Sequence, residues 1–264
     1  MKSSLLHHKT YICAPNADWL VFIHGAGGSS ATWFKQVRYF RQYYNIVLVD
    51  LRGHGESTSR DPNNNSQRYS FSLVTQDVID LLDFLNIKSA HFVGMSMGTI
   101  IVRTLIEIRP ALVKTMILAG ATVKLNCYAQ GLITIGNLFK DILPYMWLYR
   151  FFAFVVMPQR CQKEARNIFI NEARKLNKEE FKRWFALTKD AQTILKRHRK
   201  LAPQAPTIYI MGDKDRFFLE AVVQNVSRHE TSHLKVMVNC GHVCNIEQPD
   251  RFNQIAEEFL SQYR

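Results

Sequence analysis

Ser96 lies at the centre of a pattern that is typical of a serine nucleophile. Residues 94–98 are Gly-Met-Ser-Met-Gly, which matches G-x-S-x-G. A β-type run at residues 90–94 precedes Ser96 and a helical run at residues 98–108 follows it, so the serine is expected at a sharp strand-to-helix turn. The two glycines leave room for a strained backbone there. The pattern predicts nucleophilic chemistry at Ser96; the alternative is that Ser96 only caps the helix.

A serine hydroxyl is a weak nucleophile at neutral pH, so it needs a general base, and the base needs an orienting carboxylate. Asp215 and His242 follow Ser96 in the sequence, and each comes directly after an expected strand. Because loops that follow parallel strands gather at the carboxyl edge of a sheet, we expect these three side chains to meet there. Asp213 is the alternative acid, but Asp215 lies farther along its loop and reaches more easily toward the imidazole.

The chain contains 9 histidines, and besides His242 only His24 and His54 are expected near this edge. His91 begins an expected strand, which predicts partial burial. The remaining histidines fall in polar contexts and are expected on the surface: His7, His8, His198, His229 and His233.

A glycine-rich turn follows the expected strand at residues 19–23. Its sequence, His24-Gly25-Ala26-Gly27-Gly28, frees backbone N–H groups to face a ligand. The amides of Ala26 and Met97 are therefore the expected donors to an oxyanion. A phosphate-binding loop is the alternative, but neither G-x-G-x-x-G nor a Walker lysine is present. We expect substrate contacts from residues beside these groups: His24, Gly25, Phe217 and Val243.

Short apolar runs alternate with single helices over most of the chain, which predicts an α/β fold with a mostly parallel, doubly wound sheet. Residues 121–202 interrupt this alternation, because they contain helical periodicity and no convincing strand. We therefore expect a core formed by residues 1–120 and 203–264, with a helical cap at 121–202 inserted between two strands. The expected strands are residues 10–13, 19–23, 46–50, 90–94, 115–119, 207–211 and 234–238; the expected helices of the core are residues 31–43, 73–85, 98–108, 218–226 and 249–260.

Composition excludes fibrous, disordered and coiled-coil proteins, since the 264 residues are 47% hydrophobic and 21% charged, with 12 Gly and 8 Pro. The 5 cysteines are odd in number and scattered, so we expect free thiols and a cytoplasmic protein. Cys240, His242 and Cys244 form one short cluster without a second pair of ligands, which is a poor zinc pattern, and we expect no metal. The sequence contains no run of 18 or more uncharged apolar residues, so a transmembrane helix is not expected.

The net charge of +12 is concentrated in the middle of the chain, since residues 121–205 hold 16 basic and 6 acidic side chains. A solvated surface explains this charge without any partner. A peripheral contact of the basic cap with an acidic membrane is the alternative. No recognised nucleic-acid motif occurs there, so a nucleic-acid partner is not expected. The oligomeric state is left open.

Five sequence blocks occur in a recognisable order, namely residues 24–28, 50–57, 94–98 and 212–215, and Gly241-His242 followed by Glu247-Gln248-Pro249. In these blocks the chain resembles the α/β-hydrolase fold superfamily, in the group of esterases, lipases and related serine hydrolases. Two departures occur, at Thr99, where many members have Gly, and at Phe217 and Phe218, where Val or Pro is common.

This resemblance implies that Ser96 is the nucleophile, His242 the base, Asp215 the orienting acid, and Ala26 and Met97 the oxyanion donors. It also implies that residues 50–57 shape the loop beside the site, and that no cofactor is needed. A nucleophilic Asp at the elbow would have indicated a dehalogenase or an epoxide hydrolase, and Ser96 argues against both.

We expect acyl transfer from a small hydrophobic ester to water. The same three residues could also serve thioester, amide or carbon–carbon bond hydrolysis, and a small-molecule receptor could retain the fold. Aromatic and apolar residues of the cap are expected either to line a roof over Ser96 or to hold the cap together: Phe139, Leu143, Tyr145, Met146, Trp147, Phe151, Phe152 and Phe154.

Overall fold

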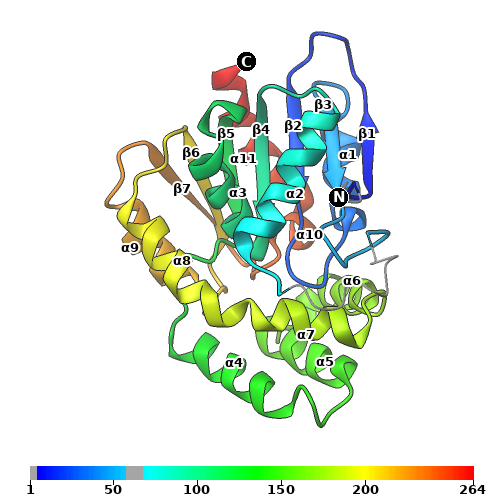
Figure 1. The fold of residues 1–264 in the computed structure, drawn as a ribbon. Helices are drawn as coiled ribbons and strands as arrows, with labels where there is room; N and C mark the ends of the chain where they lie inside the picture. Colours follow the sequence, from blue (N-terminus) through cyan, green and yellow to red (C-terminus); the bar gives the residue numbers. More distant parts are fainter. Residues whose placement is uncertain (1–4, 58–67) are drawn as a thin grey trace.

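The computed structural model describes residues 5–57 and 68–264. Its centre is a 7-stranded sheet in the order β1-β3-β2-β4-β5-β6-β7 (Figure 1). All neighbouring strands are parallel except β1, which pairs antiparallel with β3 at one edge. The predicted α/β, mostly parallel sheet is thereby confirmed. The strands are β1 His8–Tyr11, β2 Trp19–Ile23, β3 Asn45–Val49, β4 Ala90–Met95, β5 Val113–Ala119, β6 Thr207–Gly212 and β7 Ser232–Met237.

Helices cover both faces of this sheet, which is why its central strands are apolar on both sides. On one face, Val21 and Ile23 of β2 pack with α2 and α3; on the other face, Leu20 and Phe22 pack with α1 and α11. The helices of the core are α1 Phe34–Phe40, α2 Phe71–Phe84, α3 Met97–Ile108, α9 Leu219–Val226, α10 Cys244–Glu247 and α11 Pro249–Leu260.

Two boundaries differ from the sequence prediction for physical reasons. The helix expected over residues 31–43 is divided into a 3-10 turn, Ser30–Trp33, and α1, and it ends early because the amides of Tyr43 and Tyr44 both turn back to the Phe40 carbonyl. The first strand lies two residues earlier than expected, since the Asn45 side chain accepts a hydrogen bond from the Cys13 amide at 2.7 Å and takes it out of the sheet.

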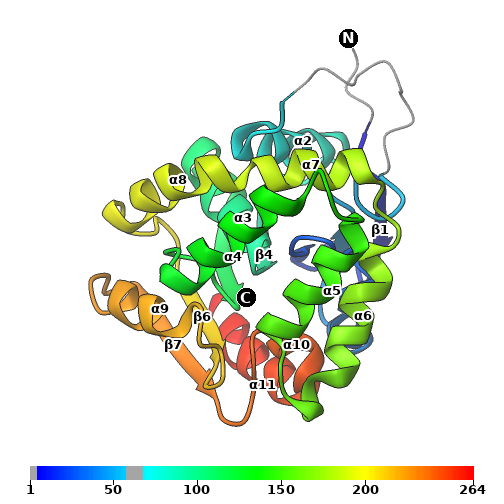
Figure 2. The same cartoon turned by 90° about the horizontal axis from the view of Figure 1, so that it is seen from below.

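Five helices fill the segment between β5 and β6, here called the helical insertion (residues 121–202). They are α4 Cys127–Phe139, α5 Tyr145–Val156, α6 Lys163–Ala173, α7 Lys178–Ala186 and α8 Thr188–Lys200. The insertion lies across the carboxyl edge of the sheet (Figures 1 and 2). It has an apolar centre of its own, formed by Leu148, Tyr149, Ala173 and Phe181. No helix among the described residues is both long and apolar enough to cross a membrane.

Buried polar contacts join the helical insertion to the core. The Trp184 indole of α7 donates to the Arg52 carbonyl at 2.9 Å, and the Tyr69 hydroxyl donates to Glu180 at 2.7 Å. Glu180 is only 1% exposed and also accepts from Arg183 at 2.8 Å. The sequence also predicts a polar loop, rich in Asn and Ser, over residues 57–70, and most of this loop lies outside the described residues.

Removing the Tyr69 hydroxyl tests how much this junction contributes to stability. Tyr69→Phe takes one donor from the buried Glu180 carboxylate, so the free energy of unfolding should fall by about 1–3 kcal/mol in urea titrations. Tyr128→Phe is the matched control, because Tyr128 lies on α4 and is 69% exposed; its effect should stay within about 0.5 kcal/mol. Equal effects of the two changes would contradict a stabilising role for this contact.

Candidate active site

Ser96 occupies a strained turn between β4 and α3. Its φ and ψ are 52° and −117°, a region that non-glycine residues rarely adopt. Its amide donates to the Ala119 carbonyl at 2.9 Å, which holds the turn against β5. A Cβ atom added at Gly98 would lie only 2.4 Å from the Ile23 carbonyl oxygen, so α3 can approach β2 only with glycine there. The side chain of Ser96 remains partly exposed.

His242 bridges Ser96 and Asp215. Its Nε2 atom lies 2.9 Å from Ser96 Oγ, and its Nδ1 atom lies 2.8 Å from Asp215 Oδ2. The structure thus brings together the three side chains selected from the sequence, although 146 positions separate Ser96 from His242. Asp213, the alternative acid, instead accepts from the Cys240 amide at 3.1 Å and from Lys214.

The Asp215 carboxylate is buried and satisfied on both oxygens. Oδ1 accepts from the amides of Phe217 and Phe218 at 3.1 and 3.2 Å, which leaves Oδ2 for the His242 ring. A carboxylate in this position favours the tautomer of His242 that carries its proton on Nδ1, which leaves Nε2 as an acceptor facing the Ser96 hydroxyl. The Phe218 ring packs beside His242, with 5.2 Å between the two ring centroids, and Phe217 packs on Phe218 and is partly exposed.

The glycine-rich turn lies directly beside Ser96. A Cβ atom added at Gly25 would be 3.2 Å from Ser96 Cβ and 3.8 Å from its Oγ. Ala26 follows in the turn and is partly exposed, and its amide makes no hydrogen bond within the described part of the chain. Met97 is the first residue of α3, so its amide has no acceptor within the helix. Both amides are therefore available to a ligand oxygen.

Two buried histidines hold this turn, and one of them corrects a prediction. His54 Nε2 accepts from the Gly27 amide at 3.0 Å, and His24 Nε2 accepts from the Leu51 amide at 3.0 Å. His24 was expected to contact substrate, but it is fully buried and its Nδ1 bonds the Gly25 carbonyl at 2.8 Å. Both of its nitrogens are thus used inside the protein. Burial lowers the pKa of His24, and that of His54 to about 3, so both rings stay neutral acceptors.

Glu247 organises the loop that carries His242. Its carboxylate accepts from the Gly241 amide at 2.7 Å and from the Val243 amide at 3.1 Å, the two residues that flank the histidine. It also accepts from Gln162 of the helical insertion at 3.2 Å. The sequence contained this glutamate only as part of a family-like block, because its role depends on a fold of the loop that no local pattern shows. Val243 itself is partly exposed beside His242.

Tyr149 of α5 lies over the glycine-rich turn, where a Cβ atom added at Gly27 would be 2.7 Å from its ring. The sequence did not select it. Five of the eight residues expected either to line a roof or to hold the cap together pack inside the helical insertion: Phe139, Leu143, Tyr145, Met146 and Phe152. The remaining three point outward, with Trp147 63%, Phe151 43% and Phe154 54% exposed. These eight residues therefore mainly hold the insertion together or face solvent.

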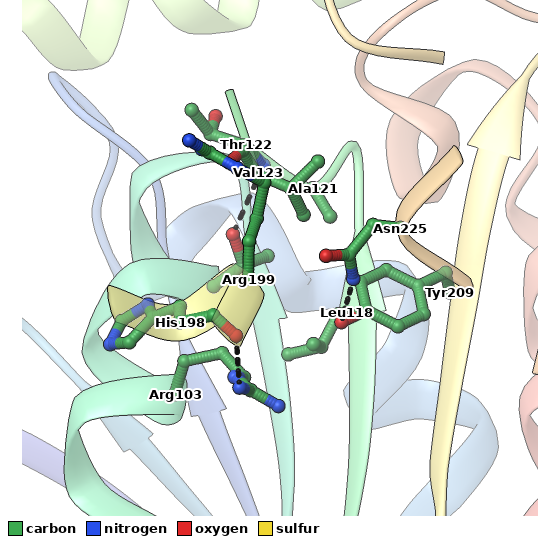
Figure 3. A pocket seen from close by; sticks show the side chains of 10 residues that line it. Arg103, Leu118, Ala121, Thr122, Val123, His198, Arg199, Tyr209 and Asn225 are labelled. Atoms are coloured by element: carbon green, nitrogen blue, oxygen red, sulfur yellow. Dashed lines mark hydrogen bonds between the residues drawn. The ribbon is translucent and has the colours of Figure 1, made fainter. Parts of the chain in front are cut away.

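A separate cavity lies behind α3 and contains none of the three catalytic candidates (Figure 3). Arg103 lines it and donates to the carbonyls of His198 and Leu201 at 2.8 and 2.9 Å, which joins α3 to the end of α8. His198 was expected on the surface but is only 6% exposed, because it packs against α3 beside Thr104. The cavity is lined by Thr99, Arg103, Leu118, Ala121, Thr122, Val123, His198, Arg199, Tyr209 and Asn225.

The cysteine and histidine cluster at residues 240–244 forms no metal site in the structure. Cys244 Sγ contacts the carbonyls of Ile210 and Gly241, and both Cys240 and Cys244 are buried free thiols. Nowhere in residues 5–57 and 68–264 do three His, Cys, Asp or Glu side chains gather in a way that could hold a metal ion.

A sequence profile described as the Alpha/beta hydrolase family matches residues 20–255. The chain belongs to the alpha/beta hydrolase family. It is 25% identical over 261 residues to 3-oxoadipate enol-lactonase 1 of Acinetobacter baylyi, covering 93% of this chain and 89% of that protein.

Solved structures of this fold match nearly the whole chain. The enol-lactonase of Burkholderia xenovorans has a TM-score of 0.79 at 19% identity, covering 97% of this chain and 96% of the other. An esterase from Exiguobacterium antarcticum has a TM-score of 0.80 at 16% identity, covering 97% and 95%. At these identities, the likeness shows the fold.

The buried histidines of this alpha/beta hydrolase should make it sensitive to acid. Burial lowers the pKa of His54 and of His198 from about 6.5 to about 3, and it also lowers the pKa values of His24 and His91. The unfolded chain binds protons on these rings near pH 6.5, whereas the folded chain does not. Stability is therefore complete above pH 6.5 and falls as the pH decreases toward 3.

The contribution of His54 can be isolated by substitution. At pH 5 it should account for a loss of about 2 kcal/mol relative to pH 7.5, so His54→Asn should reduce the pH dependence of urea unfolding by that amount. Asn retains an acceptor for the Gly27 amide. His233→Gln changes an exposed histidine and is the control. If His54→Asn left the pH dependence unaltered, the pKa of His54 in the folded protein would not be lowered.

Glu247→Gln tests whether Glu247 positions His242. The change preserves the size of the side chain but replaces a charged carboxylate, which accepts hydrogen bonds from two backbone amides, with a neutral amide. Hydrogen bonds to charged groups contribute about 1.5–3 kcal/mol to stability. We expect kcat to fall about tenfold or more, with KM nearly unchanged, because Glu247 acts through His242 and not on substrate. Glu258→Gln, at an exposed position of α11, is the control. A rise in KM at constant kcat would instead indicate a contact with substrate.

Proposed function

We propose that this protein is a serine hydrolase that cleaves carboxylic esters of small hydrophobic or acyl substrates through an acyl-enzyme intermediate. The observation that carries this proposal is the continuous chain of contacts from Ser96 Oγ through the His242 ring to Asp215, with distances of 2.9 and 2.8 Å. This is the arrangement by which a base activates a hydroxyl nucleophile.

In the first half of the proposed reaction, Ser96 Oγ attacks the ester carbonyl carbon while His242 Nε2 takes the hydroxyl proton. The amides of Ala26 and Met97 donate to the resulting oxyanion, and each such donor is worth roughly 3 kcal/mol of transition-state stabilisation. Asp215 stabilises the imidazolium. When the tetrahedral intermediate collapses, the carbon–oxygen bond to the alcohol breaks and His242 returns the proton to the leaving alcohol.

In the second half, water attacks the acyl-enzyme with His242 as base, and the carboxylic acid leaves while Ser96 regains its proton. These steps balance without a cofactor or a metal ion. The helical insertion would act as a cap that limits access of water, with Tyr149 over the glycine-rich turn. Partly exposed apolar side chains near Ser96, including Met97 and Val243, favour a hydrophobic acyl or alkyl group.

A cyclic or open-chain ester is the substrate that the relatives favour. The relative of similar length acts, by its name, on an enol-lactone, and a solved neighbour is an esterase. Hydrolysis of a thioester, amide or carbon–carbon bond by the same residues, and a receptor that only binds its ligand, are the competing proposals. A cytoplasmic location is also proposed, supported by the 5 free thiols.

Substitution of the nucleophile tests the function. Ser96→Ala should retain the folded circular dichroism spectrum and lose on the order of a million-fold in kcat on p-nitrophenyl esters, together with labelling by a fluorophosphonate probe. Ser227→Ala is the control, because Ser227 is exposed and lies after α9, outside the helical insertion. Full activity of Ser96→Ala would refute the assignment.

A substrate panel separates the remaining proposals. Esters of increasing chain length, lactones, a thioester and an anilide should be compared by kcat/KM, and we expect short or medium esters and lactones to be turned over fastest. A single slow turnover of every compound would indicate a receptor. Preference for the thioester or the anilide would retain Ser96 as nucleophile and reject the ester specificity.

A further inference from the structure

An apolar surface lies on the outside of the helical insertion, on α4, α5 and the turn between them. We call it the outer apolar face. It contains seven large apolar side chains that are more than one third exposed: Tyr128, Ile135, Leu138, Ile142, Trp147, Phe151 and Phe154. Ile142 in the turn is 73% exposed and Trp147 at the start of α5 is 63% exposed. Exposed aliphatic and aromatic groups concentrated in this way mark an interaction surface.

The spacing of these residues gives each helix two different faces. On α5, Trp147, Phe151 and Phe154 recur at intervals of four and three residues, so they share one side. Leu148, Tyr149 and Ala153 are buried on the other side. On α4, Ile135 and Leu138 face outward while Ala129 and Gly136 are buried. The outward apolar groups are therefore not part of the centre of the insertion.

The charge around this face is positive. Residues 121–164 contain five basic side chains, Lys124, Lys140, Arg150, Arg160 and Lys163, and two acidic ones, Asp141 and Glu164. Both acidic groups are paired with a lysine outside this segment, Asp141 with Lys182 at 2.7 Å and Glu164 with Lys35 at 3.1 Å. Arg150 is exposed between Trp147 and Phe151. An exposed apolar surface with cations and no unpaired anion complements a bilayer surface that carries anionic headgroups.

The outer apolar face lies at the same end of the molecule as the candidate active site. α4 and α5 are the elements that lie farthest from the sheet, beyond the carboxyl edge that carries Ser96 (Figures 1 and 2). The opposite side of α5 carries Tyr149, which contacts the glycine-rich turn at Gly27. A single helix thus separates the candidate active site from the exposed apolar surface.

We propose that the outer apolar face docks on an anionic lipid membrane, with its apolar side chains in the interface and its cations against the headgroups. A second copy of this chain is the competing occupant. Two such faces would bring together two helical insertions that each carry a net charge of +10 over residues 121–205, which opposes association. Docking does not depend on the proposed hydrolysis.

Vesicle sedimentation tests the docking. The full chain should pellet with sucrose-loaded vesicles of phosphatidylcholine and phosphatidylglycerol at 70:30, and much less with phosphatidylcholine alone. Raising NaCl from 0.1 to 0.5 M should weaken the partition coefficient severalfold, because the headgroup attraction is screened. Ser96→Ala should bind equally well, so that a failure of the proposed function and a failure of docking are distinguishable.

Substitutions on the face should reduce binding according to their chemistry. The double variant Leu138→Ser with Ile142→Ser should lower the partition coefficient about tenfold or more, since it removes two apolar groups from the interface. Arg150→Gln should lower it about fivefold, and only for anionic vesicles. Phe84→Ser is the matched control, because Phe84 is 64% exposed but ends α2 at the amino edge of the sheet.

Fluorescence gives a second readout. Of the 4 tryptophans, Trp33 and Trp184 are buried and Trp19 begins β2 at the amino edge of the sheet, whereas Trp147 is the exposed tryptophan of this face. Anionic vesicles should shift the emission to shorter wavelength, and Trp147→Phe should abolish the shift while sedimentation persists.

Binding that is indifferent to lipid charge, or unchanged in the Leu138/Ile142 variant, would overturn the proposal. A dimer in sedimentation velocity that this variant dissociates, without vesicle binding, would assign the face to a second copy.

Discussion

The close approach of α3 to the end of β2 is the constraint on which the candidate active site depends. Gly98 lies against the carbonyls of Ile23 and His24, where a Cβ atom would come within 2.4 and 2.7 Å. This contact sets the sharp turn at Ser96 and brings the glycine-rich turn after β2 alongside the serine. One packing contact between backbone segments thus positions Ser96 beside the amides of Ala26 and Met97, and the surrounding structure holds the strained backbone of Ser96.

The loops beside that contact are held by buried side chains whose protonation state is fixed. His54 and His24 accept hydrogen bonds from backbone amides only as neutral rings, and burial supplies that neutrality by lowering the pKa of each. Glu247 holds the loop that carries His242, because its carboxylate accepts hydrogen bonds from the amides of Gly241 and Val243. A neutral ring therefore holds the glycine-rich turn, whereas a carboxylate holds the loop that carries His242.

Local patterns in the sequence predicted the sheet, the helical insertion and the three residues that meet at its edge. Ser96, Asp215 and His242 could be predicted because each directly follows an apolar strand, and the register of a parallel sheet then brings such positions together. Contacts between distant segments could not be predicted from the sequence. His24 was assigned to substrate because its burial depends on Leu51, 27 positions away, and Tyr149 was missed because nothing local indicates that α5 lies over Gly27.

The helical insertion illustrates why composition alone could not assign its aromatic residues. Its apolar side chains divide among an internal cluster, a contact with the core and an exposed surface, and residues that are adjacent in sequence, such as Leu148 and Trp147, belong to different groups. Polar contacts from Trp184, Glu180 and Gln162 fix the insertion to the loops that carry the site. On α5 itself, Tyr149 lies against the glycine-rich turn at Gly27, while Trp147, Phe151 and Phe154 lie on the exposed side. The outer apolar face is therefore the side of α5 that is turned away from the candidate active site.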